Sequence, residues 1–184
     1  MNYTSLMKER LKTDLYQHCI GTAEAAFKLA AHYGADKDKA YLAGIVHDYG
    51  KRYTAGELLE KADEHGIYLD FYTRNSGKLL HAPVGAALLN IELGLGDPEV
   101  LQAVAYHTTG RRTMTLLERI LYMADYIEDG RNFEGVEEIR KAAFINFEEA
   151  LLLAVDNTIS AVIRRGLLLH PRSVAFRNSL ITQM

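Results

Sequence analysis

The recurrence of helix-start signals is the feature that most constrains the fold of this chain. Thr54–Glu57 and Thr115–Glu118 are two capping boxes, in which a threonine is followed three residues later by a glutamate. Asp97-Pro98 is a further start signal, because aspartate caps a helix and proline fits its first turn. The nearest approach to a strand pattern, Ile67 to Tyr72, is short and isolated. These signals predict an all-α fold.

The predicted helices combine a polar first residue with apolar residues three and four positions apart. They cover residues 14–33, 36–47, 54–66, 83–93, 97–107, 115–127 and 146–165, and a last helix starts at 170. Two polar or glycine-containing segments, Tyr68–Lys78 and Thr108–Thr113, are predicted to be loops. Because binding residues are common in loops held between firm helices, we expect some of them there.

The composition is that of a soluble globular protein. Of the 184 residues, 48% are hydrophobic and 24% are charged, which excludes a disordered chain. The length fits a single domain over residues 1–184. The one cysteine, Cys19, allows no internal disulfide, and the longest apolar run, Ala150 to Val155, is too short to cross a membrane. Since the charged N-terminus is not a signal peptide, a cytoplasmic protein is predicted.

The charge balance argues against a nucleic-acid-binding protein. Lysine and arginine total 21 and aspartate and glutamate total 24, which gives a formal net charge of −3. Binding to a nucleic-acid backbone depends on a basic excess that this chain lacks. A local basic pocket for a small phosphate compound is compatible with this balance.

Four of the seven histidines belong, with two aspartates, to a set of side chains that suits a metal site. Imidazole and carboxylate groups together bind transition metals, and one carboxylate can bridge two ions. The set is His18, His47, Asp48, His81, His107 and Asp125. His32 and His65 are predicted to be solvent-facing residues at helix ends, and the role of His170 is open.

Some residues of this set also have an ordinary structural interpretation. His18 alone could be a packing residue, and His47 could stabilise the C-terminal end of a helix through the helix dipole. Asp125 lies in an apolar stretch, where burying an unpaired aspartate is costly, so it needs either a metal or an arginine as partner. Spacing alone does not bring distant helices together, so both interpretations stay open at this point.

A longer set of motifs resembles one known family. His18, His47-Asp48 and Asp125 match the H…HD…D pattern of the HD-domain superfamily of metal-dependent phosphohydrolases. The surrounding sequence resembles the YqeK family of that superfamily over about residues 11–178. The motifs are Ala43-Gly-Ile-Val-His47-Asp48-Tyr-Gly-Lys51, Leu80-His81-Ala-Pro-Val-Gly-Ala, Tyr106-His107-Thr108-Thr109-Gly110, Tyr122-Met-Ala-Asp125-Tyr-Ile-Glu128-Asp-Gly-Arg131, Gly135-Val-Glu-Glu-Ile-Arg140 and His170-Pro171 with Arg177-Asn178.

The resemblance implies an all-α HD-domain helical bundle and an activity. The activity is symmetrical hydrolysis of diadenosine tetraphosphate, or a related dinucleoside polyphosphate, to two nucleoside diphosphates. The implied cofactor is iron, as one or two ions, with manganese or another divalent metal as the alternative. The implied partners are the small-molecule substrate and its nucleoside diphosphate product, with no nucleic acid and no membrane; a homodimer is left open.

The chain departs from the family pattern at two positions that are not expected ligands. Asp129 stands where proline is usual, and Cys19 stands where a small hydroxylated residue is common. Cys19 lies about 100° round the helix from His18, so it is interpreted as a packing residue.

Carried over residue by residue, the resemblance assigns a metal site and a reaction. The first metal would be held by His18, His47, Asp48 and Asp125. Asp48 would bridge to a second metal held with His81 and His107, or these two histidines would contact phosphate. The catalytic residues would be Asp48, Lys51, His81 and His107, and the reaction would be attack of a metal-bound water on an inner phosphate.

The same motifs imply the substrate-binding residues, with cations for phosphate and loop residues for the nucleotide. The set is His18, Asp48, Lys51, Arg52, Tyr53, Thr54, His81, His107, Thr108, Asp125, Arg131, His170, Arg172 and Arg177. Thr109 and Gly110 could add a hydroxyl and a backbone N–H group. The alternatives are structural, with Lys51 and Arg52 as ordinary helix-end cations and Arg131 paired with Glu128 or Glu134.

Two other functions fit the same residues. One is a hydrolase of a different nucleotide, and the other is a non-catalytic regulator that binds a nucleotide or a metal. The presence of every expected ligand favours an enzyme over the regulator.

Overall fold

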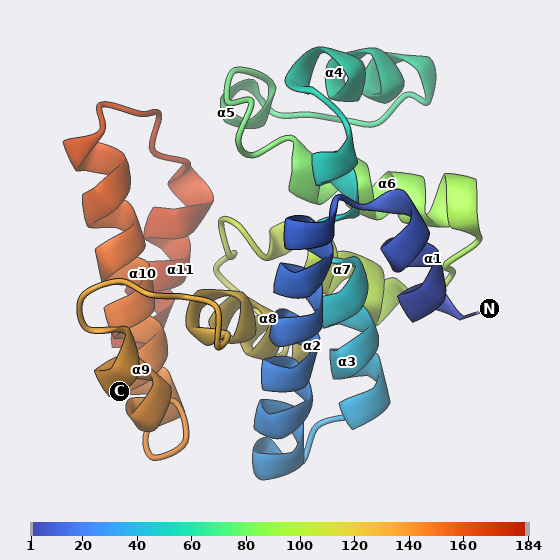
Figure 1. Ribbon diagram of the computed structural model, residues 1–184. Coiled ribbons are helices and arrows are strands. Elements are labelled where there is room, and N and C mark those ends of the chain that lie inside the picture. The colour runs from blue at the N-terminus through green and yellow to red at the C-terminus, as the bar shows by residue number, and fades with distance from the viewer. Residues whose placement is uncertain (1, 183–184) are drawn as a thin grey trace.

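The computed structural model describes residues 2–182, and every regular element in that range is helical, which confirms the all-α prediction. The elements are α1 (Tyr3–Arg10), α2 (Thr13–Tyr33), α3 (Lys37–Val46), the 3₁₀ turn η1 (Tyr49–Arg52), α4 (Ala55–Glu64), α5 (Phe71–Arg74), α6 (His81–Leu93), α7 (Pro98–Tyr106), α8 (Leu116–Ile127), α9 (Val136–Ala142), α10 (Phe147–Arg164) and α11 (Pro171–Ile181). In Figure 1, α2 and α3 run side by side, α4 and α5 lie at one end, and α10 and α11 form one flank.

The longer helices begin where the sequence signals predict. The Thr54 hydroxyl accepts the backbone N–H of Glu57, whose carboxylate accepts the N–H of Thr54, so α4 has a complete capping box. The Thr115 hydroxyl accepts the N–H of Glu118 at the start of α8. Asp97 caps α7 through its carboxylate. These bonds satisfy N–H groups that would otherwise have no partner inside the helix.

Four short elements lie where no helix was predicted. They are α1, η1, α5 and α9, and α5 makes the loop prediction for Tyr68–Lys78 wrong at Phe71–Arg74. Asp70 starts α5 by accepting the N–H of Thr73, and α9 follows Gly135, whose φ of 86° suits glycine. Such short helices depend on tertiary contacts more than on a periodic pattern.

The contact between α2 and α3 is made by their backbones. A Cβ atom on Gly44 would lie 2.4 Å from Cα of Ala23, so only glycine permits this approach. Gly44 precedes His47 by three residues, and Ala23 follows His18 by five. The contact therefore fixes the distance between the segments that carry these two histidines.

The apolar core lies between α2, α3, α6, α7 and α8. Leu29, Ile45, Leu88, Val104 and Met123 are each buried within it. Burying one such side chain favours folding by about 1.5–3 kcal/mol. The core thus holds in place the helix ends that carry the candidate ligands.

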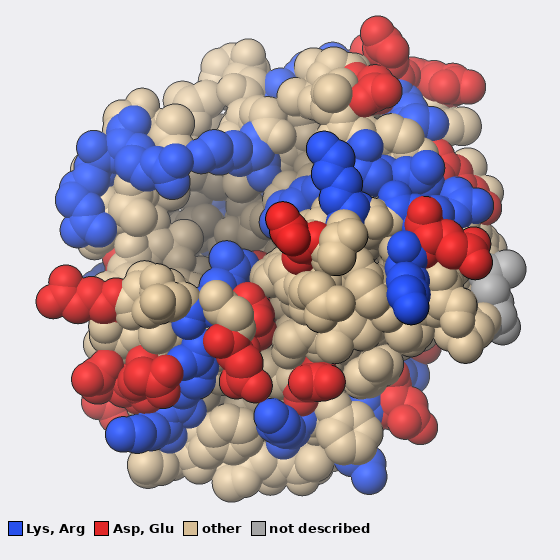
Figure 2. All heavy atoms as spheres, in the orientation of Figure 1, with Lys and Arg blue, Asp and Glu red and all other residues tan. Residues whose placement is uncertain are grey.

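The surface is hollowed between the α10–α11 flank and the part of the molecule that contains η1 and α5. Figure 2 shows this hollow with lysine and arginine side chains along its upper and left edges. Within the described part of the chain, no helix combines the length and the apolar character needed to span a bilayer.

Candidate metal centre

Asp48 lies at the centre of a cluster of four imidazoles. Its Oδ2 is 3.4 Å from Nε2 of His18 and 3.2 Å from Nε2 of His47. Its Oδ1 is 3.2 Å from Nε2 of His81 and 3.6 Å from Nε2 of His107. The two oxygens of one buried carboxylate therefore face two separate pairs of histidines.

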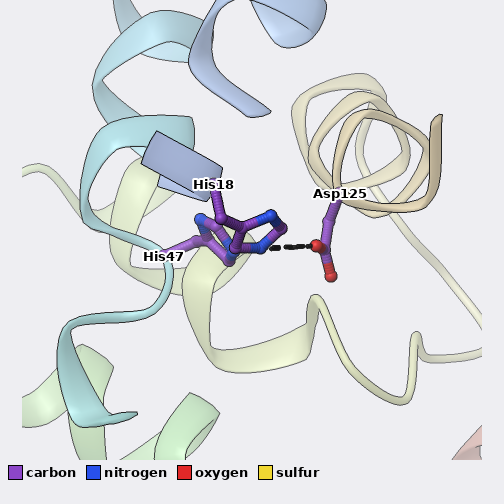
Figure 3. Close-up of side chains that lie close together, drawn as sticks. All are labelled: His18, His47 and Asp125. Atoms are coloured by element: carbon purple, nitrogen blue, oxygen red, sulfur yellow. Dashed lines mark hydrogen bonds and ion pairs between the residues drawn. The ribbon is translucent and has the colours of Figure 1, made fainter. Parts of the chain in front are cut away.

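Asp125, near the end of α8, completes the first of these two groups. Nε2 of His18 lies 3.0 Å from Oδ1 of Asp125, and Nε2 of His47 lies 3.8 Å from it. Figure 3 shows the three side chains pointing toward one another from α2, from the end of α3 and from α8. All six residues predicted as ligands are thus brought together in the structure.

Two of the histidines reach the cluster from the C-terminal ends of helices. His47 and His107 follow the last residues of α3 and α7, and Nδ1 of each donates to a carbonyl in its own last turn, Gly44 O and Val104 O, at 2.7 Å. A carbonyl can only accept, so Nδ1 carries the proton and Nε2 faces Asp48. Both imidazoles are therefore oriented by the backbone.

His81 reaches Asp48 because η1 and α6 approach each other at two glycines. A Cβ on Gly50 would lie 2.3 Å from the carbonyl oxygen of His81, and a Cβ on Gly85 would lie 2.9 Å from the nitrogen of Gly50. Any larger residue at these positions would push the first turn of α6 away from Asp48.

The charges of the cluster suit a cation. Burial by itself would raise the pKa of the Asp48 carboxyl, but the positive charge of His47 and the other neighbouring imidazoles together outweigh burial, and that pKa lies well below its usual value. The pKa of Asp125 is likewise lowered against the effect of burial, chiefly by the hydrogen bond from His18. Burial lowers the pKa of His107 to about 4, so this imidazole is neutral at pH 7.

The donor atoms fit a metal ion. Oδ1 of Asp48 is buried and accepts no hydrogen bond, although two imidazole nitrogens lie beside it. In neutral His107, Nε2 carries a lone pair and no proton. This atom also lies 3.2 Å from Nε2 of His81. Unpaired buried acceptors of this kind are costly, and imidazole and carboxylate groups together are ligands for divalent transition metals.

Two cationic side chains lie at the edge of the cluster. Nζ of Lys51 is 2.6 Å from Oδ2 of Asp48. Arg131 contacts Asp125 twice, with Nη2 at 2.5 Å from Oδ1 and Nε at 2.8 Å from the backbone oxygen. Asp125 therefore has both a histidine and an arginine as partners.

A cavity of about 260 Å³ opens beside the cluster between α8 and α10. Its lining includes His107, Thr108, Asp125 and Arg131. The aromatic rings of Tyr126 and Phe133 also line it, with their centroids 5.1 Å apart. The Thr109 hydroxyl, which the sequence suggested as a phosphate contact, donates instead to the carbonyl of Gly110.

Three residues predicted to bind substrate have other partners, and two of them, Arg52 and Tyr53, belong to a network around Glu92. Arg52 donates from Nη1 to the Tyr49 hydroxyl at 2.7 Å, and Tyr53 donates to the Glu92 carboxylate at 2.9 Å. Thr54 caps α4. The structure does not bring these three side chains to the cluster.

Three predicted residues of the C-terminal segment pair with aspartates. Nε2 of His170 lies 3.2 Å from the Asp70 carboxylate, and Nη2 of Arg172 lies 2.9 Å from the same group. Arg177 donates from Nε to Asp156 at 2.5 Å. These contacts join α11 to α5 and to α10.

Glu128 is a residue of the site that the sequence interpretation did not assign to it. Its Oε1 lies 3.2 Å from Nδ1 of His18. The Glu128-Asp-Gly-Arg131 motif was the available signal, but the sequence suggested Glu128 only as a partner for Arg131. The contact with His18 joins residues 110 positions apart, which spacing could not reveal.

The chain is similar to known proteins over most of its length. The HD domain family model matches residues 15–130 of the chain. The protein named symmetrical bis(5'-nucleosyl)-tetraphosphatase from Halalkalibacterium halodurans is 41% identical over 182 residues, covering 97% of this chain and 95% of the relative. The protein of the same name from Bacillus subtilis is 37% identical over 176 residues, covering 96% of this chain and 94% of the relative.

A solved structure is similar over nearly the whole chain. It comes from Clostridium acetobutylicum and is described as a "predicted HD superfamily hydrolase involved in NAD metabolism". It has a TM-score of 0.94 and 40% sequence identity, and the match covers 99% of this chain and 96% of the other.

Proposed function

This chain belongs to the HD domain family, and on that premise we propose that it hydrolyses diadenosine tetraphosphate symmetrically to two ADP. The relatives from Halalkalibacterium halodurans and Bacillus subtilis carry that activity in their names. The observation that carries the proposal is the Asp48 carboxylate, whose two oxygens each face a pair of imidazoles. Such an arrangement is suited to metal-dependent cleavage of a phosphoric anhydride.

The cluster would hold one or two divalent metal ions. His18, His47, Asp48 and Asp125 would hold one, and Asp48 with His81 and His107 would hold the other or contact phosphate. We propose iron as the metal, with manganese or another divalent ion as the alternative, because imidazole and carboxylate ligands suit both. When bound, a divalent ion supplies a Lewis acid and lowers the pKa of coordinated water toward neutrality.

Lys51 and Arg131 would bind the substrate's polyphosphate chain. Lys51 is partly exposed, and its Nζ contacts buried Asp48, so it joins the cluster to the solvent. Arg131 presents a planar fork of donors that matches two oxygens of one phosphate. By neutralising charge on the inner phosphates, the two cations would make ADP a better leaving group and favour cleavage at the middle of the chain.

One nucleoside half of the substrate would lie in the cavity between α8 and α10. The rings of Tyr126 and Phe133 offer a face on which a base can stack. The cavity continues into a groove that shares Tyr126, Arg131 and Phe133 and adds Arg164 and Arg165 from the end of α10. A groove with aromatic and cationic walls suits a nucleotide.

Substrate binding by the residues in and after η1 and by those of the C-terminal segment remains a proposal. Contact of substrate with Arg52, Tyr53, Thr54, His170, Arg172 and Arg177 would require these side chains to exchange their present partners. A single domain over residues 1–184, a cytoplasmic location and a homodimer are likewise proposals, which rest on the sequence and its resemblance.

Product identification tests the proposed reaction. Purified protein loaded with iron is incubated with diadenosine tetraphosphate, and the products are separated by chromatography. We expect ADP as the sole product, at two molecules for each substrate consumed. ATP and AMP in equal amounts would show asymmetric cleavage and contradict the proposal, and absence of turnover would favour a non-catalytic binding protein.

A further inference from the structure

Glu128 is buried beside His18, on the side of the ring that faces away from the other candidate ligands. Glu128 follows the last residue of α8, and its side chain is 6% exposed. Oε1 lies 3.2 Å from Nδ1 of His18, while Nε2 of the same ring lies 3.0 Å from Asp125. The imidazole is therefore held between two carboxylates, one on each nitrogen.

This arrangement differs from that of the neighbouring histidines. His47 and His107 are oriented by carbonyls of their own helices. His18 lies in the middle of α2, where the backbone carbonyls are used by the helix itself. Its ring is oriented instead by the Glu128 side chain at the end of α8. Replacing that side chain should therefore change the orientation of the ring.

Glu128 is itself fixed by several contacts. Its Oε2 accepts the backbone N–H of Gly130 at 2.6 Å, and Nε of Arg131 lies 3.7 Å from Oε1. Arg140 donates from Nη2 to the Glu128 carbonyl at 2.8 Å. A carboxylate held in this way offers His18 a fixed acceptor.

Gly21 provides the space that the Glu128 carboxylate occupies. It lies on α2 three residues after His18, and therefore on the same face of the helix. A Cβ on Gly21 would lie 2.6 Å from Oε2 of Glu128. Alanine at this position would push the carboxylate away from His18.

From these contacts we propose that Glu128 is a positioning residue, seated against Gly21, which holds His18 for metal binding. By accepting the Nδ1–H of His18, it leaves Nε2 as the nitrogen that faces Asp48 and Asp125. Metal-bound histidines commonly donate their second nitrogen to such an acceptor, and its loss costs about 10- to 100-fold in metal affinity. The inference rests on the proposed function only in that the cluster binds a divalent ion.

Manganese binding to the metal-stripped full-length protein tests this proposal. The dissociation constant is measured by calorimetric titration for the wild type, E128A, E128Q and G21A. We expect E128A and G21A to bind manganese about 10- to 100-fold more weakly. E128Q should lose less manganese affinity than E128A, because its one carbonyl oxygen can still accept from His18. Some affinity should be lost, because that oxygen cannot also accept the N–H of Gly130.

Glu24 provides the matched control. It is an exposed glutamate on α2 that lines the same surface cavity as Glu128, so E24Q removes the same charge nearby. We expect E24Q to bind manganese as the wild type does. An equal loss in E24Q and E128Q would mean that charge alone matters and would overturn the positioning role.

The double variant G21A/E128A separates a shared contact from two independent effects. Since both substitutions act on one contact, the double variant should lose no more affinity than the weaker-binding single variant. If the fold-loss of manganese affinity in the double variant equals the product of the losses in G21A and E128A, the proposal is contradicted.

Thermal unfolding of the metal-free proteins provides the second readout. A merely structural role would lower the melting temperature and leave the manganese dissociation constant of the folded protein unchanged, and that result would overturn the inference. Wild type that binds no manganese, iron or other divalent ion would overturn both this inference and the proposed function. Wild-type binding with unchanged affinity in E128A and G21A would overturn the inference alone.

Discussion

Nζ of Lys51 lies 2.6 Å from Oδ2 of Asp48, one 3₁₀ turn further along the chain. Asp48 is fully buried, whereas 38% of the Lys51 side chain is exposed, so the lysine reaches the cluster from the solvent side. This position suits a cation that stabilises charge developing on the substrate rather than one that holds the fold.

Lys51→Met keeps most of the aliphatic stem and removes the charge. We expect kcat for diadenosine tetraphosphate to fall by about 100-fold or more, since a preorganised donor beside the reacting phosphate is lost. Steady-state kinetics measures the effect. Lys28→Met removes an exposed lysine on α2, away from Lys51, and should leave kcat unchanged. Equal kcat in both variants would contradict a role for Lys51.

Arg131→Lys keeps the charge beside Asp125 but removes the planar fork. Two hydrogen bonds from the guanidinium hold Arg131 on Asp125, and within residues 2–182 its other N–H groups donate no hydrogen bond. Losing one charge-assisted hydrogen bond to substrate should raise KM about tenfold or more. A variant with unchanged KM and kcat would mean that Arg131 serves only the structure.

The sequence predicted the elements whose signals are local. α4, α7 and α8 begin at cap residues that are followed by an apolar helical pattern, and both features lie within a few residues. α9 could not be predicted in this way, because it has few turns and depends on its packing, with Val136 and Ile139 buried.

In the candidate site too, features with a local sequence signal could be predicted and those that depend on tertiary packing could not. The adjacent pair His47-Asp48 was visible in the sequence, and the resemblance to a known family extended it to residues on other helices. The role of Glu128 depends on α8 crossing α2 next to His18, and spacing carries no information about such a crossing. Arg52 and Tyr53 were expected at the substrate because they follow Lys51. Instead, Tyr53 donates to Glu92 on α6, and Nη1 of Arg52 lies 4.0 Å from the same carboxylate.

Gly44→Ala tests the close contact between α2 and α3. The added Cβ would lie 2.4 Å from Cα of Ala23, and backbone atoms cannot move aside as a side chain can. We expect the free energy of unfolding to fall by about 1–3 kcal/mol. Denaturant unfolding measures this change.

Gly56→Ala is the matched control for that experiment. Gly56 lies in the first turn of α4, where a Cβ would meet nothing within 4 Å. Because alanine favours a helix over glycine by about 0.5–1 kcal/mol, this variant should be as stable as the wild type or more so. A smaller loss for Gly44→Ala than for Gly56→Ala would contradict the close packing of α2 on α3 as the cause.

His170 should make the stability of the fold depend on pH. Burial lowers the pKa of His170 below its ordinary value of 6.5, against the opposing effect of Asp70, and Arg172 lowers it further. Its Nδ1 also accepts the N–H of Arg172 at the start of α11, so a proton on Nδ1 would remove that cap. The unfolded chain therefore binds a proton more readily than the folded one, and stability is lost as the pH falls below 6.5.

His170→Asn removes the titrating group and keeps a good capping side chain. Denaturant unfolding at pH 7 and at pH 5 should show a smaller loss of stability on acidification for the variant than for the wild type. An equal or larger loss in His170→Asn would contradict the assignment of this pH dependence to His170.

The cluster around Asp48 is expected above all to bind the metal that the hydrolysis of diadenosine tetraphosphate requires. The most direct measurement compares metal content and turnover in the wild type and in Asp48→Ala, with circular dichroism as a check on folding. We predict that the folded variant retains neither metal nor activity, while wild-type activity rises with the metal bound and yields two ADP for each substrate. Full activity in Asp48→Ala would contradict this role of the cluster.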